Sequence, residues 1–163
     1  MRNEAIERLK SLYKVEHFRS LPNISEQCKY VPAFSDKNAN SLTKCILTWL
    51  RLSGHQVERV ANMGRMIDNR KIVTDCIGRQ RMIGSSRWIP GTGTNGTADL
   101  HSVIKSKAVK IEIKIGRDRQ SEAQKEYQRQ IETAGGIYII VRTFDEFLQW
   151  YDNFISEDVS HGR

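Results

Sequence analysis

The sequence is poor in cysteine and proline, and it contains no long apolar run. Its three cysteines, Cys28, Cys45 and Cys76, are widely spaced and form no C-x-x-C pair, which argues against a zinc site or a disulfide framework. No stretch approaches the roughly 18 apolar residues of a membrane-spanning helix. The first residues also lack the apolar core of a secretory signal. We therefore expect a cytoplasmic protein with free, buried or half-buried thiols, no membrane partner and no small-molecule cofactor.

Acidic residues are also scarce relative to basic ones. The chain has 26 lysines and arginines against 19 aspartates and glutamates, a formal net charge of +7. Such an excess points to a polyanionic partner such as nucleic acid, and it carries no information about the fold. With 163 residues, of which 39% are hydrophobic, the chain is long enough for one domain with a substantial core.

Apolar spacing and capping signals predict four helices. Helical periodicity runs over residues 2–18 and 41–53, and Gly54 follows the second run as a C-terminal cap. The intervening residues 19–35 contain two prolines and no periodicity, so we expect an irregular connection. Ser121–Gln124 and Thr143–Glu146 have the form of capping boxes, each opening a further helix. Residues 156–163 are expected to form a flexible tail.

Four segments are predicted to be strands: residues 57–60, 99–104, 108–115 and 137–141. A tight turn at 105–107 joins the second to the third, and strict alternation in the third places Lys110, Glu112 and Lys114 on one face. The apolar run 137–141 suits a strand buried on both faces. The order of helices and strands predicts an α/β domain, with a mixed central sheet flanked by helices.

Residues 61–98 are rich in glycine and basic side chains, and here we expect a hairpin or extended loops. Two interpretations of this segment remain open. The basic side chains either track a phosphate backbone or cover an ordinary solvated loop.

Asp99, Glu112 and Lys114 form the most informative constellation. A hairpin of the strands 99–104 and 108–115 brings Asp99 toward the end where Glu112 and Lys114 share a face. Two carboxylates and the backbone carbonyl of Ile113 offer the oxygen ligands that Mg²⁺ prefers, with an ammonium beside them. Such a site can support phosphodiester hydrolysis. The ordinary alternative is a cross-strand charge pair with no catalytic role.

Five segments of the sequence, taken in order, resemble the VRR-NUC branch of the PD-(D/E)XK nuclease superfamily. They are T-K-C-I-L-T-W-L-R-L-S-G-H-Q-V-E-R at 43–59, G-T-A-D-L at 96–100, K-I-E-I-K at 110–114, R-Q-S-E-A-Q-K-E-Y at 119–127 and A-G-G-I-Y-I-I-V at 134–141. The resemblance covers about residues 36–155 and implies a restriction-endonuclease-like core. The helix within residues 1–35 and the basic, glycine-rich insertion lie outside the usual minimal core.

The resemblance implies a metal-dependent endonuclease that hydrolyses DNA. By position, Asp99 and Glu112 would be the Mg²⁺ or Mn²⁺ ligands, with the carbonyl of Ile113, and Lys114 would be the catalytic lysine. Gln124 matches a glutamine that lines the site in this branch. Small stand-alone members occur in phages and mobile elements, several act on branched or flapped DNA, and some pair as homodimers. We expect DNA contacts from eight cationic residues: Arg65, Arg79, Arg81, Arg87, Lys110, Arg117, Arg119 and Lys125.

One departure from the family pattern keeps other functions open. Many relatives carry a glutamate on the first core helix, whereas this chain has Asn40 in that neighbourhood and Asp36 lies one or two turns too early. Asn40 would then be a neutral ligand. The alternatives are a catalytically silent DNA-binding module on the same fold, or a basic protein-interaction domain with no role in nucleic-acid chemistry.

Overall fold

A four-stranded mixed sheet forms the centre of the molecule. Its order is β1 (Gln56–Arg59), β6 (Leu100–Ile104), β7 (Lys107–Ile113) and β8 (Ile137–Val141). Strand β6 pairs antiparallel with both β1 and β7, and β8 runs parallel to β7. The mixed central sheet predicted from the sequence is therefore confirmed. The computed structural model describes residues 2–19, 21, 23, 25–60, 64–91 and 93–157.

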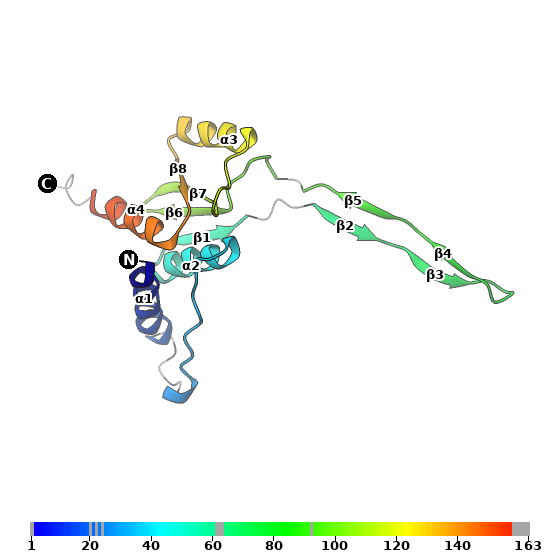
Figure 1. Cartoon of the computed structure of the whole chain (residues 1–163), viewed down its shortest axis with the longest axis horizontal. Helices are drawn as coiled ribbons and strands as arrows, with labels where there is room; N and C mark the ends of the chain where they lie inside the picture. The colour runs from blue at the N-terminus through cyan, green and yellow to red at the C-terminus, as the bar shows by residue number, and fades with distance from the viewer. Residues whose placement is uncertain are drawn as a thin grey trace.

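The helices lie on both faces of this sheet. Helices α1 (Arg2–Leu12), α2 (Ala39–Leu52) and α4 (Phe144–Glu157) gather on one side, while α3 (Glu122–Thr133) lies across the sheet from them (Figure 1). A short π-helix at Tyr13–His17 extends α1, and a 3-10 turn at Glu26–Cys28 interrupts the otherwise irregular connection to α2.

The hydrophobic core lies between the sheet and the three-helix side. Alternate residues of β7, Val109, Ile111 and Ile113, are buried in one cluster with fully buried side chains from the helices, including Leu42 and Phe144. The strict alternation of apolar and polar residues in this strand predicted that these side chains share one face. The opposite residues of β7 are therefore left for the side of the sheet that α3 covers.

Both predicted capping signals are used, although the second differs in detail. Ser121 and Gln124 form a reciprocal capping box at the start of α3. Thr143 Oγ1 accepts the backbone N–H of Glu146 at 3.1 Å, but the Glu146 carboxylate accepts from the backbone of Arg142. In the second box, the glutamate carboxylate therefore accepts from the residue before the N-cap, and not from the N-cap residue itself.

Three sequence expectations need correction. Strand β8 lies at the sheet edge, and Ile137, Ile139 and Ile140 are only half buried, so it is not buried on both faces. All three cysteines are free as predicted, but Cys28 and Cys76 are exposed. Asp99, which was expected to begin the strand, lies in a bend directly before β6.

Within the described residues, no helix has the combined length and apolarity needed to cross a bilayer.

The glycine-rich segment forms a long hairpin that projects from the body of the molecule (Figure 1). Strands β2 (Arg65–Asp68) and β5 (Ser86–Ile89) pair near the body, and β3 (Lys71–Thr74) and β4 (Gln80–Ile83) pair further out. We call residues 64–89 the hairpin arm. The hairpin alternative predicted for this region is confirmed, whereas residues 61–63 and 92 lie outside the described part of the chain.

Asp36 has a structural role at the start of α4. It is buried, and its Oδ2 accepts the backbone N–H of Phe144 at 3.3 Å. The first N–H groups of a helix have no partner within the helix, so a buried one needs an acceptor from elsewhere. Asp36 supplies that acceptor from the segment that precedes α2.

We expect Asp36→Ala to lower the free energy of unfolding by about 1–3 kcal/mol, because the buried N–H of Phe144 loses its acceptor. Urea denaturation monitored by circular dichroism measures the change. Asp36→Asn, which keeps a side-chain oxygen, is expected to lose less. An Asp36→Ala variant as stable as the wild type would contradict this role.

Candidate active site

Asp99 and Glu112 lie opposite one another on the side of the sheet that α3 covers. Leu100 pairs with Ile111, so the next residue outward on each side brings Asp99 across from Glu112. Asp99 is fixed there because its Oδ2 accepts the backbone N–H of Ile113 at 2.9 Å. The Ile113 side chain points the other way, into the core. The structure thus brings together the two predicted acids and the backbone of the residue between Glu112 and Lys114.

Glu112 and Lys114 form a buried ion pair. Their side chains sit two residues apart on one face, Lys114 Nζ lies 3.0 Å from Glu112 Oε1, and the two residues are only 2% and 5% exposed. Asp118, in the loop after β7, lies 3.5 Å from the same ammonium. This is not the solvated charge pair of an exposed strand face, since both charges are removed from water.

Gln124 connects this pair to helix α3. Its Oε1 accepts from Lys114 Nζ at 3.0 Å and from the backbone of Ser121 at 2.9 Å, and its Nε2 donates to Glu112 Oε1. The capping box therefore holds the amide in the orientation that satisfies both charged groups. One side chain starts the helix and braces the site, as the resemblance implied for a site-lining glutamine.

Gly96 allows the loop that carries Asp99 to approach α3. Its φ is +79°, and a Cβ at this position would lie 2.2 Å from the backbone oxygen of Ala123 and 2.7 Å from the backbone nitrogen of Gln124. Only glycine permits both the left-handed conformation and this close approach. The loop before Asp99 and the first turn of α3 are therefore in direct backbone contact.

Burial and neighbouring charge shift the acid–base behaviour of the ion pair. Desolvation raises the pKa of Glu112, and the charge of Asp99 adds to this effect against the opposing hydrogen bond from Lys114. Desolvation lowers the pKa of Lys114, but its hydrogen bond and attraction to Glu112, with help from Asp118, outweigh that effect and leave the pKa raised. Lys114 is therefore an ammonium in this geometry, so it can donate hydrogen bonds and stabilise negative charge.

Tyr138 is a member of the site that the sequence did not reveal. It is buried on β8, and its hydroxyl donates to Glu112 Oε2 at 3.4 Å. Burial, together with the charge of Glu112, raises the pKa of Tyr138, which keeps the phenol protonated. In the sequence Tyr138 falls within an apolar run, and only the pairing of β8 with β7 shows which face it occupies.

The donor set fits a hard divalent cation. Asp99 and Glu112 supply carboxylate oxygens whose mutual repulsion contributes to the raised pKa of Glu112. A cation between them would relieve that repulsion. Among the described residues no cluster of three or more histidine, cysteine, aspartate or glutamate side chains is arranged to hold a metal. The ligand set predicted from the sequence is the two acids and the carbonyl of Ile113, which are the oxygen ligands that Mg²⁺ or Mn²⁺ prefers.

The two residues considered as substitutes for the family's helix glutamate have other partners. Asp36 binds the start of α4, as described above. Asn40 Oδ1 accepts from Arg59 Nη2 at 2.9 Å. Arg59 pairs with Leu100 across the sheet.

The eight cationic residues predicted to contact DNA fall into two groups. Arg65, Arg79, Arg81 and Arg87 are exposed on the hairpin arm. The others lie on the elements that carry the site: Lys110 on β7 is half buried, Arg117 and Arg119 are exposed in the loop before α3, and Lys125 is exposed on α3 with Glu122 2.7 Å away. Arg142 holds that loop by donating to the carbonyl oxygens of Gly116 and Asp118 at 3.0 Å.

Neither a scan against protein-family models nor a search of curated proteins finds a match to this chain.

We expect Gly96→Ala to destabilise the protein by at least about 2–3 kcal/mol, since the added methyl group meets the backbone of α3. Gly135→Ala is the matched control, because Gly135 has nearly the same φ, +80°, but no atom within 4 Å of an added Cβ. That variant isolates the conformational cost, about 1 kcal/mol. Urea denaturation measures the free energy of unfolding of both variants. Equal decreases would show that the contact with α3 contributes nothing to stability.

Proposed function

We propose that this protein is a divalent-metal-dependent endodeoxyribonuclease that hydrolyses DNA phosphodiester bonds. The observation that carries the proposal is the convergence of Asp99, Glu112 and a buried, protonated Lys114 at one point on the sheet. Burying an ion pair costs several kcal/mol per charge, and an apolar pair of similar size would often be more stable. A braced and buried pair beside a second carboxylate is more economically explained by chemistry than by folding.

The side chains have separate tasks in this proposal. Asp99 and Glu112, with the carbonyl of Ile113, would hold Mg²⁺ or Mn²⁺, which when bound would activate water and neutralise charge on the phosphate. Lys114, whose Nζ lies 3.0 Å from Glu112 Oε1, would stabilise the negative charge that develops on the phosphate oxygens. Gln124 orients both Glu112 and Lys114, and Tyr138 donates to the second oxygen of Glu112.

DNA is the proposed substrate on two grounds. The five sequence segments that resemble VRR-NUC nucleases include each proposed site residue, and the basic residues Arg117, Arg119 and Lys125 are exposed next to Asp118 and Gln124 in the sequence. The same resemblance favours branched or flapped DNA and allows a homodimer. It also suggests a phage or mobile-element type of stand-alone nuclease.

One observation favours a second candidate function, a catalytically silent DNA-binding module. The helix position that often supplies a third acid carries Asn40, which is bound by Arg59, and Asp36 is used at the start of α4. Two carboxylates make a weaker metal site than three. The two functions differ in whether metal binds and whether DNA is cut.

We expect Asp99→Asn, Glu112→Gln and Lys114→Ala each to reduce cleavage at least about 100-fold, because each removes a ligand or a charge that the transition state needs. The measurement is the initial rate on a panel of linear, flapped and branched DNAs with Mg²⁺ or Mn²⁺. Lys107→Ala is the matched control, since Lys107 is an exposed lysine on the same strand and should leave the rate unchanged. Cleavage retained by Glu112→Gln would remove the assignment of the site.

We expect isothermal titration to show Mg²⁺ or Mn²⁺ binding to the wild type, with at least a tenfold loss of affinity in Asp99→Asn, because half of the carboxylate ligands are gone. Asp36→Asn serves as the control acid outside the site. A wild type that binds duplex DNA in a salt-sensitive way, but binds neither metal, would support the catalytically silent module.

A further inference from the structure

The hairpin arm consists of two short ladders, β2–β5 and β3–β4, each with two different faces. Asp68 pairs with Ser86 and Lys71 pairs with Ile83, so both strands advance by three residues between the ladders and the register is unchanged. Within a ladder, residues directly opposite share a face, and so do residues two apart along a strand. The side chains of each ladder can therefore be sorted into two sets.

One face of each ladder carries a cation on both of its rungs. Arg65 is opposite Ile89, Arg87 opposite Ile67, Lys71 opposite Ile83 and Arg81 opposite Val73. All four cations are exposed. Arg81 lies 3.8 Å from Asp75, while Arg65, Lys71 and Arg87 have no acidic partner among the described residues. We call these two faces together the cationic face.

The other face of each ladder carries a cross-strand apolar pair. Met66 is opposite Trp88 and Ile72 is opposite Met82, and the Trp88 ring lies over Gly64. Cross-strand apolar and aromatic pairs of this kind help to hold the two strands together. These four apolar side chains are nevertheless exposed on the arm. The arm has six basic residues and two acidic ones, a net charge of +4 out of the chain's +7.

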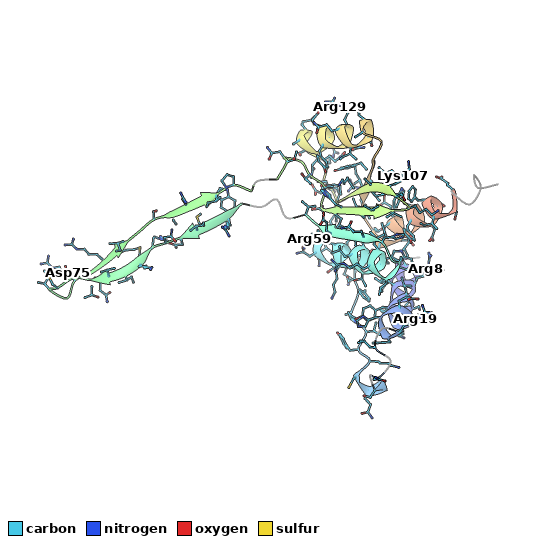
Figure 2. All side chains as sticks on the ribbon, turned by 180° about the vertical axis from the view of Figure 1, so that it is seen from behind. Arg8, Arg19, Arg59, Asp75, Lys107 and Arg129 are labelled. Carbon is cyan, nitrogen blue, oxygen red and sulfur yellow. The ribbon has the colours of Figure 1, made fainter. Side chains whose placement is uncertain are left out.

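The turn at the tip of the arm is fixed by hydrogen bonds. Asp75 Oδ1 accepts the backbone N–H groups of Ile77 and Arg79 at 3.1 and 2.8 Å. In the body, the chain before the arm lies beside the chain after it, because Val60 donates its N–H to the carbonyl of Asp99 at 2.9 Å. Figure 2 shows Asp75 at the far end and Arg59 on the side of the body from which the arm leaves.

We propose that the hairpin arm binds duplex DNA beside the candidate active site, with the cationic face against the sugar–phosphate backbone; this inference deepens and rests on the proposed function. Each strand of the ribbon has about ten residues, or about 33 Å at ~3.3 Å per residue. That length matches about ten base pairs at ~3.4 Å each. The substrate is then a duplex that extends roughly one helical turn from the cleavage position, and a two-stranded ribbon has the width that a major groove admits.

The charge of the hairpin arm favours DNA over a second copy of the chain as its binding partner. A second copy that packs on the exposed apolar face of the arm would leave the cationic face without counter-charge. A second arm would bring another +4 beside the first. A phosphate backbone instead supplies a negative charge at regular intervals along the whole ribbon, and its counterions are released when the cations bind.

The test measures DNA affinity against salt, without divalent metal, so that no cleavage is involved. The arm variant combines Arg65→Gln, Lys71→Gln, Arg81→Gln and Arg87→Gln. The matched control removes the same charge from the body through Lys10→Gln, Lys14→Gln, Arg19→Gln and Arg51→Gln. A third variant replaces residues 69–85 by Asn-Gly and shortens the arm. No core residue lies in the arm, so the fold, checked by circular dichroism, should persist.

Fluorescence anisotropy with labelled 12- and 24-base-pair duplexes in EDTA, from 50 to 200 mM salt, gives the slope of log affinity against log salt. We expect the arm variant to lose about three to four units of slope, at ~0.9 per phosphate contact, and the body variant to lose less than one. The shortened arm should also lose the wild type's preference for the longer duplex.

The inference is overturned if the arm variant and the body variant lose equal slope, or if the wild type binds neither duplex. It is also overturned if the shortened arm keeps full DNA affinity but converts a dimer to a monomer in sedimentation velocity, because the arm would then be an interface between copies. A wild type that shows the expected slopes but cuts no DNA would leave the arm assignment standing and reject the nuclease.

Discussion

The buried Glu112–Lys114 pair is the interaction on which the local structure depends. Two charges out of water are tolerated only when their remaining hydrogen-bonding capacity is satisfied. Gln124 meets that requirement from α3, Tyr138 from β8 and Asp118 from the loop between β7 and α3. Each of these groups must therefore be held in register with β7. The backbone contact between Gly96 and the first turn of α3 is part of the same requirement, because it ties the Asp99 loop to the helix that carries Gln124.

The parts of the site that the sequence predicted are those set by short-range rules. The period of two in β7 placed Glu112 and Lys114 on one face, and a two-residue turn through Lys105 and Ser106, both with positive φ, fixed the pairing that brings Asp99 opposite Glu112. The capping box at Ser121 placed Gln124 at the start of its helix. These signals are local in sequence, so a single sequence is enough to read them. The mixed sheet followed from the same kind of signal, whereas for the arm the sequence left a hairpin and extended loops as alternatives.

What the sequence could not provide depends on which distant segments become neighbours. Tyr138 looked like one more apolar residue until the parallel pairing of β8 with β7 put it beside Glu112. The edge position of β8 has the same origin, since strand order is not encoded in any single strand. Asp36 could be judged only by its distance along the chain, whereas in space it meets a helix more than 100 residues later. The register of the arm could not be predicted either, because the sequence does not show which residue of the outgoing strand pairs with which residue of the returning strand.

Cations in this molecule occur in two environments, and the environment determines what each can contribute. Lys114 is desolvated and fully bonded, so its charge acts strongly at short range and cannot be moved without disturbing the fold. The cations of the arm are exposed, so they cost little to maintain, and in the proposed complex they would act through the number of phosphates they meet. Chain connectivity links the two, because the arm lies between Val60 and Asp99, whose backbones are hydrogen-bonded. A polyanion held along the arm would thereby be directed toward the carboxylates, which alone would repel it. In the proposed function, affinity and chemistry would thus be assigned to different residues.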